Sequence, residues 1–142
     1  MLGKPNIVFI LLDNVGWGDF GVYGGLTPTP RVGELARQGI RFNNYNVESQ
    51  CTPTRAAILP RHYSVRSGTY TVPFPGQGKM GLASWEYTIP KLLSDSDYTT
   101  AMFGKCRLSN TPGRMPNEQG FHEWWGHSQL LRRGGLLQAF AV

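Results

Sequence analysis

Long apolar segments of the kind found in membrane proteins are missing from this sequence, and its first residues show no signal-peptide pattern. Its longest uninterrupted apolar run, Ile7 to Leu12, has six residues, whereas spanning a bilayer takes roughly 18 to 20. Met1 is followed almost at once by this run, without the basic region, long apolar core and small-residue cleavage site of a signal peptide. We therefore expect a cytoplasmic protein with no membrane partner.

Cysteine is also scarce, since Cys51 and Cys106 are the only two in 142 residues. They could form one bridge, but a cytoplasmic location favours free thiols. The sequence alone does not supply the geometry that a disulfide needs.

The charge is only mildly unbalanced, with 14 Lys and Arg against 9 Asp and Glu. An excess of this size suits an anionic partner, although it is more often an ordinary solvated surface. The basic residues are scattered apart from Arg132 and Arg133, and no helix-turn-helix, zinc-finger or RNA-binding signature is present. We therefore expect no nucleic-acid partner. A hydrophobic content of 40% instead predicts one compact domain with a core.

Strands and helices alternate in the predicted secondary structure. Strands are predicted at Asn6 to Leu12, at Ile40 to Val47, around Gly68 to Val72 and at Tyr98 to Phe103. Helices are predicted at Pro30 to Gln38, from Cys51 to Pro60 and after the capping residue Thr88. The first strand is apolar on both faces, which is typical of a parallel sheet covered on both sides. The pattern therefore predicts an α/β fold with a mainly parallel sheet and flanking helices.

Polar residues follow two of these strands. Asp13 and Asn14 come directly after the first, and Lys105 comes shortly after the strand that ends at Phe103. Ligands collect at the carboxyl ends of strands in open α/β sheets, and carboxylate and amide oxygens suit Ca²⁺ or Mg²⁺. An Asp-Asn pair is, however, more often a turn, and a lone lysine is more often exposed to solvent. Together with Cys51, these residues could share one edge of the sheet.

Cys51 is predicted to lie at a helix N-terminus, with Arg55 one turn further along. The helix dipole and the arginine would favour a thiolate, or an anionic substrate beside it. The alternative is a small buried apolar residue, which is common for a free cysteine.

Four segments together resemble the sulfatase family, within the alkaline-phosphatase-like superfamily. NIVFILLDNVGWGDFGVYGG is similar to the family's opening strand and metal loop, and CTPTR matches its C-x-P-x-R signature. FGKCRL lies where a G-K-x-H segment is usual, and EQGFHEWWG resembles a further family segment. The resemblance runs from Pro5 to about Gly126. It implies a truncated sulfatase core over residues 1–126, followed by a tail of unclear role at 127–142.

The resemblance implies a role for each candidate residue. Cys51 would be oxidised by a separate formylglycine-generating enzyme to formylglycine, whose hydrate is the nucleophile. Asp13 and Asn14, with the group derived from Cys51, would bind Ca²⁺ or Mg²⁺. Arg55 would steady the hydrate, and Lys105 would bind the sulfate group. The expected function is that of an arylsulfatase-like hydrolase of small sulfate esters that also accepts phosphate esters.

The chain also departs from the family pattern. Pro60, Arg61 and His62 stand where the signature continues through Thr-Gly-Arg, Asn14 stands at the second acidic ligand, and Arg107 replaces a histidine. Family members are several times longer, and further ligands come from their downstream segments. The alternative function is therefore a catalytically impaired fragment that binds anions or metal and self-associates.

A homo-oligomer is expected because a truncated sheet would leave an apolar face exposed. The residues expected to cover that face lie in the tail and are apolar: Leu130, Leu131, Leu136, Leu137 and Phe140.

Overall fold

The computed structural model describes residues 3–72, 81–108, 111–127 and 138–141, with the side chains of 127 and 138–141 excepted. It divides into two compact units, one formed by Met1–Asp13 with Glu48–Val142 and the other by Asn14–Val47. Each unit is described by itself. The expected boundary between a domain and a tail at residue 126 stays a prediction.

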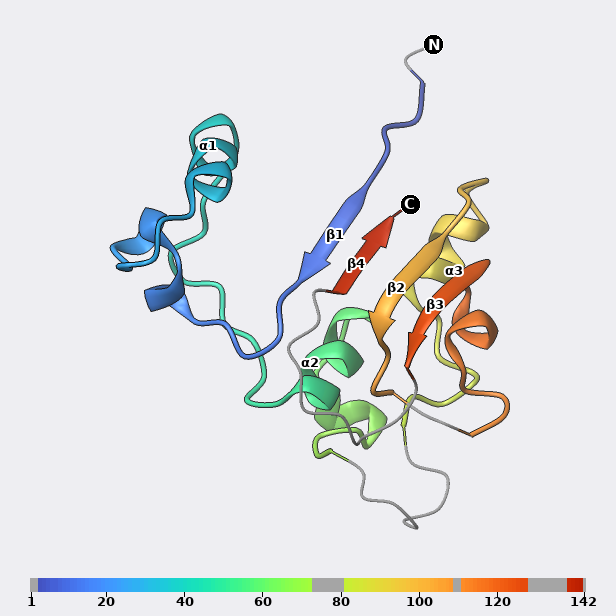
Figure 1. The fold of residues 1–142 in the computed structure, drawn as a ribbon. Coiled ribbons are helices and arrows are strands. Elements are labelled where there is room, and N and C mark those ends of the chain that lie inside the picture. Colours follow the sequence, from blue (N-terminus) through green and yellow to red (C-terminus); the bar gives the residue numbers. More distant parts are fainter. Residues whose placement is uncertain (1–2, 73–80, 109–110, 128–137, 142) are drawn as a thin grey trace. The chain divides into compact units, whose positions relative to one another are not determined.

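The larger unit is built on a four-stranded sheet in the order β1-β4-β2-β3 (Figure 1). The strands are β1 Val8–Leu11, β2 Ala101–Lys105, β3 Glu123–His127 and β4 Gln138–Ala141. β2 and β3 are parallel, whereas β4 is antiparallel to both β1 and β2. β1, β2 and β3 therefore run in one direction. The predicted α/β class with a mainly parallel sheet is confirmed, and β4 adds an antiparallel strand that was not predicted.

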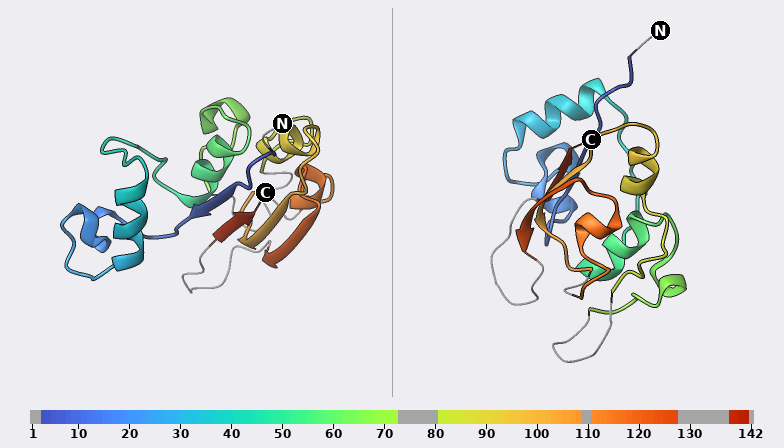
Figure 2. Two further views of the ribbon diagram at one scale, coloured as in Figure 1. Left: turned by 90° about the horizontal axis from the view of Figure 1, so that it is seen from above. Right: turned by 90° about the vertical axis from the view of Figure 1, so that its right-hand side faces the viewer.

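Two helices of this unit, α2 Cys51–Ile58 and α3 Ile89–Ser94, lie on one face of the sheet (Figure 2). Both were predicted from their starting signals. Thr88 caps α3, because its hydroxyl oxygen accepts a hydrogen bond from the backbone N–H of Lys91 at 3.4 Å. Two short 3₁₀ helices, η3 Ser64–Ser67 and η4 Pro116–Gln119, complete the layer. No helix in the described part of the chain is long and apolar enough to cross a membrane.

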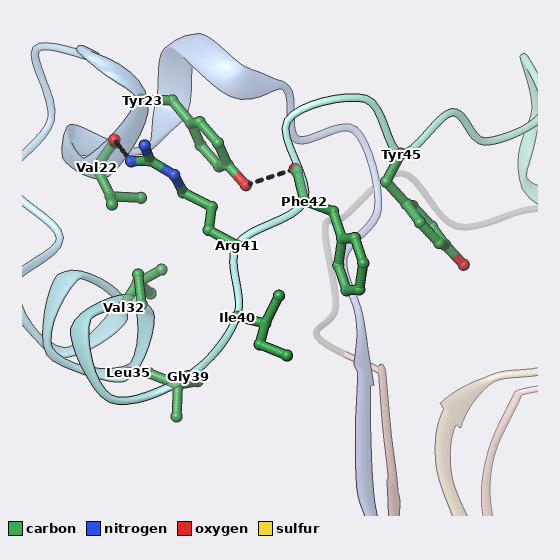
Figure 3. A pocket seen from close by; sticks show the side chains of 10 residues that line it. Val22, Tyr23, Val32, Leu35, Gly39, Ile40, Arg41, Phe42 and Tyr45 are labelled. Atoms are coloured by element: carbon green, nitrogen blue, oxygen red, sulfur yellow. Dashed lines mark hydrogen bonds between the residues drawn. The ribbon is translucent and has the colours of Figure 1, made fainter.

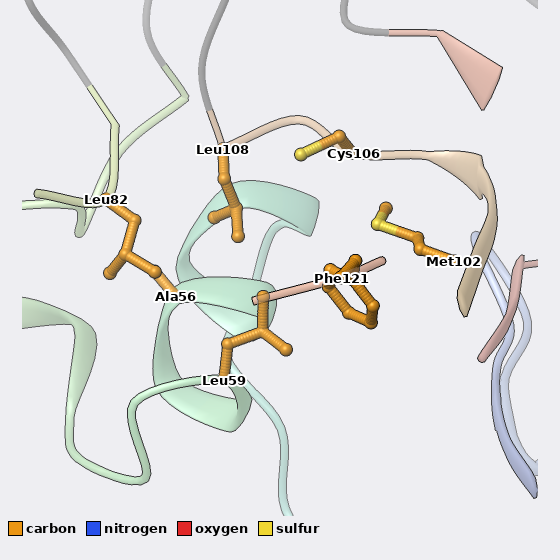
Figure 4. Packing of buried hydrophobic residues seen from close by; sticks show 7 residues of the cluster. All are labelled: Ala56, Leu59, Leu82, Met102, Cys106, Leu108 and Phe121. Carbon is orange, nitrogen blue, oxygen red and sulfur yellow. The ribbon is translucent and has the colours of Figure 1, made fainter. Parts of the chain in front are cut away.

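The apolar core joins helix α2 to strand β2 (Figure 4). Its buried members come from α2, from β2 and from the segments around them: Ala56, Leu59, Leu82, Met102, Cys106, Leu108 and Phe121. Met102 is 1% exposed, while its neighbour Phe103 is 42% exposed, so β2 buries one face only. This packing fixes the start of α2 near the end of β2, which is where the candidate site lies.

Three predictions about strands were wrong. Residues 40–47 and 68–72 form bends, turns and irregular backbone, not strands. Alternating apolar residues do not make a strand unless another strand pairs with them. β1 is not covered on both faces, because Val8 and Ile10 are 64% and 59% exposed. Within the described sheet, β1 is an edge strand.

The tail is only partly described. Leu130, Leu131, Leu136 and Leu137 lie outside the described residues, as does the side chain of Phe140. Their expected role as a cover for the sheet therefore stays a prediction.

The smaller unit contains helix α1 Pro30–Gln38 and two 3₁₀ turns, η1 Trp17–Asp19 and η2 Gly21–Tyr23. The bounds of α1 are the predicted ones. Thr29 precedes it, and its hydroxyl oxygen accepts a hydrogen bond from the N–H of Gly21 at 3.0 Å, which ties η2 to the start of the helix. Asp19 caps its own turn by accepting from the N–H of Gly16 at 2.7 Å. Asp19 therefore acts here as a loop residue.

An apolar hollow of about 430 Å³ lies within this smaller unit (Figure 3). It is lined by one face of α1 and by the segment that follows, including Ile40 and Phe42. Arg41 donates a hydrogen bond to the carbonyl of Val22 at 2.8 Å, and the Tyr23 hydroxyl donates to the carbonyl of Phe42 at 3.3 Å. None of the predicted site residues lines this hollow.

A charged pair links the turn after α2 to the segment before α3. His62 Nε2 lies 3.0 Å from the carboxylate of Glu86, and its Nδ1 lies 3.1 Å from the carbonyl of Tyr63. Both ring nitrogens face acceptors, so the doubly protonated ring is favoured. The hydrogen bond to Glu86, helped by the one to Tyr63, raises the pKa of His62 above its usual value.

This pair predicts that stability falls as the pH rises. The pKa of His62 is higher in the folded protein than in the unfolded chain, where it is about 6.5. The stabilisation that the protonated ring gives the folded protein is therefore complete below the unfolded pKa and is lost as the pH rises through the folded pKa. Denaturant unfolding of the wild type and of His62→Gln from pH 5.5 to 8.5 would measure it. The difference in the free energy of unfolding between the wild type and His62→Gln should become smaller with increasing pH. A constant difference would contradict the prediction.

Candidate active site

Asp13 lies two residues beyond β1 and is the acidic centre of the site. Its Oδ2 forms an ion pair with Lys105 Nζ, and Arg55 Nη2 lies 4.0 Å away. The Asp13 side chain is 12% exposed and that of Lys105 is 17% exposed. Lys105 is the last residue of β2, so the ends of β1 and β2 meet through this pair.

Arg55 is buried one turn into α2, with its side chain 3% exposed. Its Nη1 donates a hydrogen bond to the backbone carbonyl of Cys51 at 3.0 Å. Burial lowers the pKa of Arg55 and the charge of Asp13 opposes this shift, but an arginine remains protonated at neutral pH. A permanent positive charge therefore lies between Asp13 and the first residue of α2.

Cys51 is the first residue of α2 and is a half-buried free thiol. The entry to this helix is fixed by Thr54, whose hydroxyl lies 2.8 Å from the carbonyl of Gln50 and 3.0 Å from that of Glu48. A helix of eight residues begins here, so the positive end of its dipole lies at Cys51. Cys106, by contrast, is buried in the core.

The chain leaves β2 in a strained conformation that is tied to α2. Arg107 has a φ of 58°, in the left-handed region that non-glycine residues rarely adopt. Its carbonyl accepts a hydrogen bond from the hydroxyl of the buried Thr52 at 2.9 Å. The Nε of Arg107 is buried and has no hydrogen-bond partner among the described residues. The segment after Lys105 is thus held against the first turn of α2.

Three cations therefore act on one carboxylate. Burial of Asp13 raises its pKa, but the hydrogen bond and charge of Lys105 and the charges of Arg55 and Arg107 lower it more, so the net pKa is below the usual value. Asp13 is ionised at neutral pH. Three positive charges against one negative charge leave the cluster with an excess of positive charge, which suits an anionic substrate.

The structure brings Asp13 and Lys105 into contact, and Arg55 lies between Asp13 and the backbone carbonyl of Cys51. Their chemical roles stay predictions. Asn14 is exposed, has a φ of 58° and begins the smaller unit. Sequence reasoning treated Arg107 only as a missing histidine, although its place two residues after Lys105 could have indicated a third cation.

A family model described as "Sulfatase" matches residues 5–133. This chain belongs to the sulfatase family. It is 37% identical over 131 residues to N-acetylgalactosamine-6-sulfatase of Rattus norvegicus and 40% identical over 126 residues to arylsulfatase A of Homo sapiens. Each alignment covers 86% of this chain and 25% of the relative. This sulfatase chain thus spans about a quarter of the length of these relatives.

Solved structures agree with the family. The crystal structure of Ps i-CgsB matches with a TM-score of 0.75 and 31% identity, over 80% of this chain and 26% of that one. The crystal structure of Ps i-CgsB in complex with k-i-k-neocarrahexaose also matches, with a TM-score of 0.75 and 30% identity. The expected truncated core of the alkaline-phosphatase-like sulfatase fold is therefore confirmed.

The departure at Arg61 leaves the backbone unusual. Arg61 has a φ of 61°, and it stands where the family signature has glycine. Glycine adopts this left-handed conformation without a steric cost, whereas other residues pay roughly 1 kcal/mol or more. The turn after α2 thus has a backbone that suits glycine, although the residue is arginine.

Sulfatases generally use a formylglycine and a divalent metal. The described residues do not form a complete metal site by themselves, because no group of three or more His, Cys, Asp or Glu is placed to hold an ion. Asp13 is already paired with Lys105, and Ca²⁺ usually takes six to eight oxygen ligands. The residues present therefore do not fit a metal on their own, and no catalytic step is assigned to one.

Proposed function

We propose that this sulfatase chain provides part of the active site of a sulfate-ester hydrolase, in which a group derived from Cys51 is the nucleophile. The observation that carries the proposal is the cluster in which Arg55 donates to the backbone carbonyl of Cys51 and lies 4.0 Å from Asp13, while Lys105 pairs with Asp13. A nucleophile at a helix N-terminus beside fixed positive charges is suited to attack on an anionic ester.

In the proposed reaction, a separate formylglycine-generating enzyme first oxidises the Cys51 side chain by two electrons with dioxygen as the oxidant. The carbon–sulfur bond breaks, the sulfur leaves as hydrogen sulfide, and the aldehyde that forms takes up water. One hydroxyl of the hydrate loses its proton as its oxygen attacks the sulfur atom. The bond from sulfur to the ester oxygen breaks, and that oxygen takes up a proton to leave as the alcohol. The second hydroxyl then loses its proton, the carbon–oxygen bond to the sulfate breaks, and the aldehyde forms again. Lys105 stabilises the charge on the sulfuryl oxygens, and Arg55 holds the first turn of the helix in place.

The substrate class follows from the relatives. Two of them are named for sulfate removal from a sugar or an aryl group, and one solved neighbour is in complex with k-i-k-neocarrahexaose. We propose small sulfate esters of sugars or phenols. Release of sulfate from 4-nitrophenyl sulfate and from a 6-sulfated N-acetylgalactosamine would test this. If a preparation that carries formylglycine released sulfate from neither substrate, the proposal would be overturned. The alternative of a catalytically impaired fragment that binds anions would then be favoured.

Phosphate monoesters are a second candidate substrate, favoured by the third cation. Arg107 adds a charge where the family pattern has a histidine, and its charge reaches Asp13. Phosphate monoesters carry two negative charges at neutral pH, against one on a sulfate monoester, so they gain more from the extra charge. Release of phosphate from 4-nitrophenyl phosphate in the same assay tests this.

The modification of Cys51 is a further prediction. Formylglycine, formed to supply the nucleophile, lowers the intact mass by about 18 Da, and we expect this loss to map to the peptide with Cys51. The Cys51→Ala variant should keep its fold and lose all turnover, while Cys106→Ala should keep the modification. An unmodified thiol in an active preparation would contradict the mechanism.

Metal binding, self-association and a cytoplasmic location are further proposals for this chain. We propose that Ca²⁺ or Mg²⁺ binds through Asp13, Asn14 and the group derived from Cys51, together with ligands from outside the described residues. Self-association is supported by the exposure of Val8 and Ile10 on β1, and light scattering would measure it. The cytoplasmic location stays a proposal, which microscopy of the tagged chain would test.

A further inference from the structure

Strand β4 lies between the two strands that lead to the charged pair of the candidate site. β1 ends two residues before Asp13, and Lys105 is the last residue of β2. β4 pairs with both strands, and in the described sheet it is the only strand that pairs with β1. Figure 1 shows β4 in red between the blue β1 and the orange β2. The strand leading to Asp13 is therefore attached to the sheet through β4.

The pairing of β4 fixes where the two charged residues emerge. Ala139 pairs with Ile10 on one side and with Phe103 on the other. Asp13 comes three residues after Ile10, and Lys105 comes two residues after Phe103, in the same direction. A strand rises about 3.3 Å per residue, so a pairing shift of two residues would displace Asp13 by about 7 Å along the sheet. Such a shift would break the ion pair.

β4 also sets the distance across the sheet. Neighbouring strands lie about 4.8 Å apart, so the backbones of β1 and β2 are separated by about 10 Å. The long side chain of lysine, together with the carboxylate of Asp13, spans such a gap where the two strands end. In the described sheet no other strand pairs with β1, and its further printed support is the packing of Leu11 against the apolar core.

The family match does not account for this strand. The match covers residues 5–133 and ends before β4 begins at Gln138. The residues that carry the charges lie inside the matched region, whereas the strand that aligns them lies outside it. This arrangement separates the chemistry of the site from the element that positions it.

We propose that β4, residues 138–141, is a positioning element of the active site, which sets the register and spacing at which Asp13 meets Lys105. The consequence for catalysis rests on the proposed function, whereas the geometric part does not.

The test is the Ala139→Pro variant, with Ala139→Ser as the matched control that keeps the backbone N–H. Proline cannot donate to the ladder and is not accommodated inside a central strand. A carbodiimide, which joins a carboxylate to an amine in direct contact by an amide bond with loss of one water, should link Asp13 to Lys105. Peptide mapping would measure the yield. Hydrogen exchange would report the protection of each strand.

We expect Ala139→Pro to lower the yield of the Asp13–Lys105 link at least about tenfold and to speed exchange in β1 by a similar factor, while β2 and β3 stay protected. Ala139→Ser should resemble the wild type. Where turnover is measurable, it should fall about 100-fold in the proline variant, because a misplacement of about 1 Å can cost that much. An unchanged link and unchanged β1 protection would overturn the inference.

An inactive wild type and an unfolded Ala139→Pro variant have different consequences for the inference. If the wild type hydrolyses no sulfate ester, the proposed function fails, but the cross-link and exchange data still decide the role of β4. If Ala139→Pro does not fold, exchange in the wild type decides it. In that case the free energy of opening measured by hydrogen exchange should be the same for the amides of β1 and β4. The inference would be overturned if the amides of β1 stayed protected while those of β4 exchanged.

Discussion

Replacing Lys105 with methionine should lower kcat/KM for sulfate-ester hydrolysis about 100- to 1,000-fold, the range found when one preorganised donor is removed from an oxyanion-binding site. Methionine keeps much of the side-chain length and removes the charge. The loss should fall mainly on kcat, because the charge matters most as the sulfuryl group is transferred. Steady-state kinetics on the full chain carrying formylglycine would measure it.

The same substitution should change Asp13 in a way that does not depend on turnover. Lys105 supplies both a hydrogen bond and a charge that lower the pKa of Asp13. Without Lys105, that pKa should rise, although Arg55 and Arg107 still oppose the rise. NMR titration of the Asp13 carboxyl carbon would follow it. A pKa that stays unchanged would show that the ion pair does not form in solution.

Lys4→Met is the matched control. Lys4 also forms an ion pair with a carboxylate, at 3.2 Å from Asp97, but the two side chains are 55% and 93% exposed. Exposed pairs contribute little, so this variant should keep its activity and its stability. If kcat/KM fell by no more than threefold in Lys105→Met, or fell equally in Lys4→Met, Lys105 would have no role in the proposed chemistry.

Local signals predicted the helices well. α1 has the predicted bounds because Pro30 fixes its first turn and Gly39 follows its last residue, both short-range effects. The strand predicted at Tyr98 to Phe103 is displaced to Ala101–Lys105. The reason is long-range, since Thr100 donates its backbone N–H to His122 Nδ1 at 3.0 Å and its hydroxyl to the Gly120 carbonyl at 2.7 Å. The sequence pattern cannot show such contacts.

The part of the candidate site that could be predicted consists of residues at the ends of strands and at the start of a helix. Asp13, Cys51 and Lys105 were brought together by the rule that ligands collect at the carboxyl ends of parallel strands. The position of β4 was not predictable, because a four-residue strand carries little periodicity and its pairing depends on distant partners. The buried Nε of Arg107 likewise depends on the backbone turn after β2.

The second large effect concerns the core that holds the site together. Leu82 is fully buried, and its backbone N–H donates to the carbonyl of Leu108 at 3.1 Å, three residues after Lys105. It shares the apolar cluster with Ala56 of α2 and Met102 of β2. Leu82 therefore supports both elements that carry the charged residues of the site.

The Leu82→Ala variant should lose about 2–5 kcal/mol in the free energy of unfolding, because the removed atoms leave a cavity that the core fills only in part. Domains are stable by only about 5–15 kcal/mol, so a large share of the stability is at risk. Leu26→Ala is the control, since Leu26 is 99% exposed and its truncation should change stability by no more than about 0.5 kcal/mol. Denaturant unfolding of both variants would measure the difference. A loss in Leu82→Ala below about 1 kcal/mol would mean that α2 and β2 are not joined through this core, and the shared edge of Cys51, Arg55 and Lys105 would then need another support.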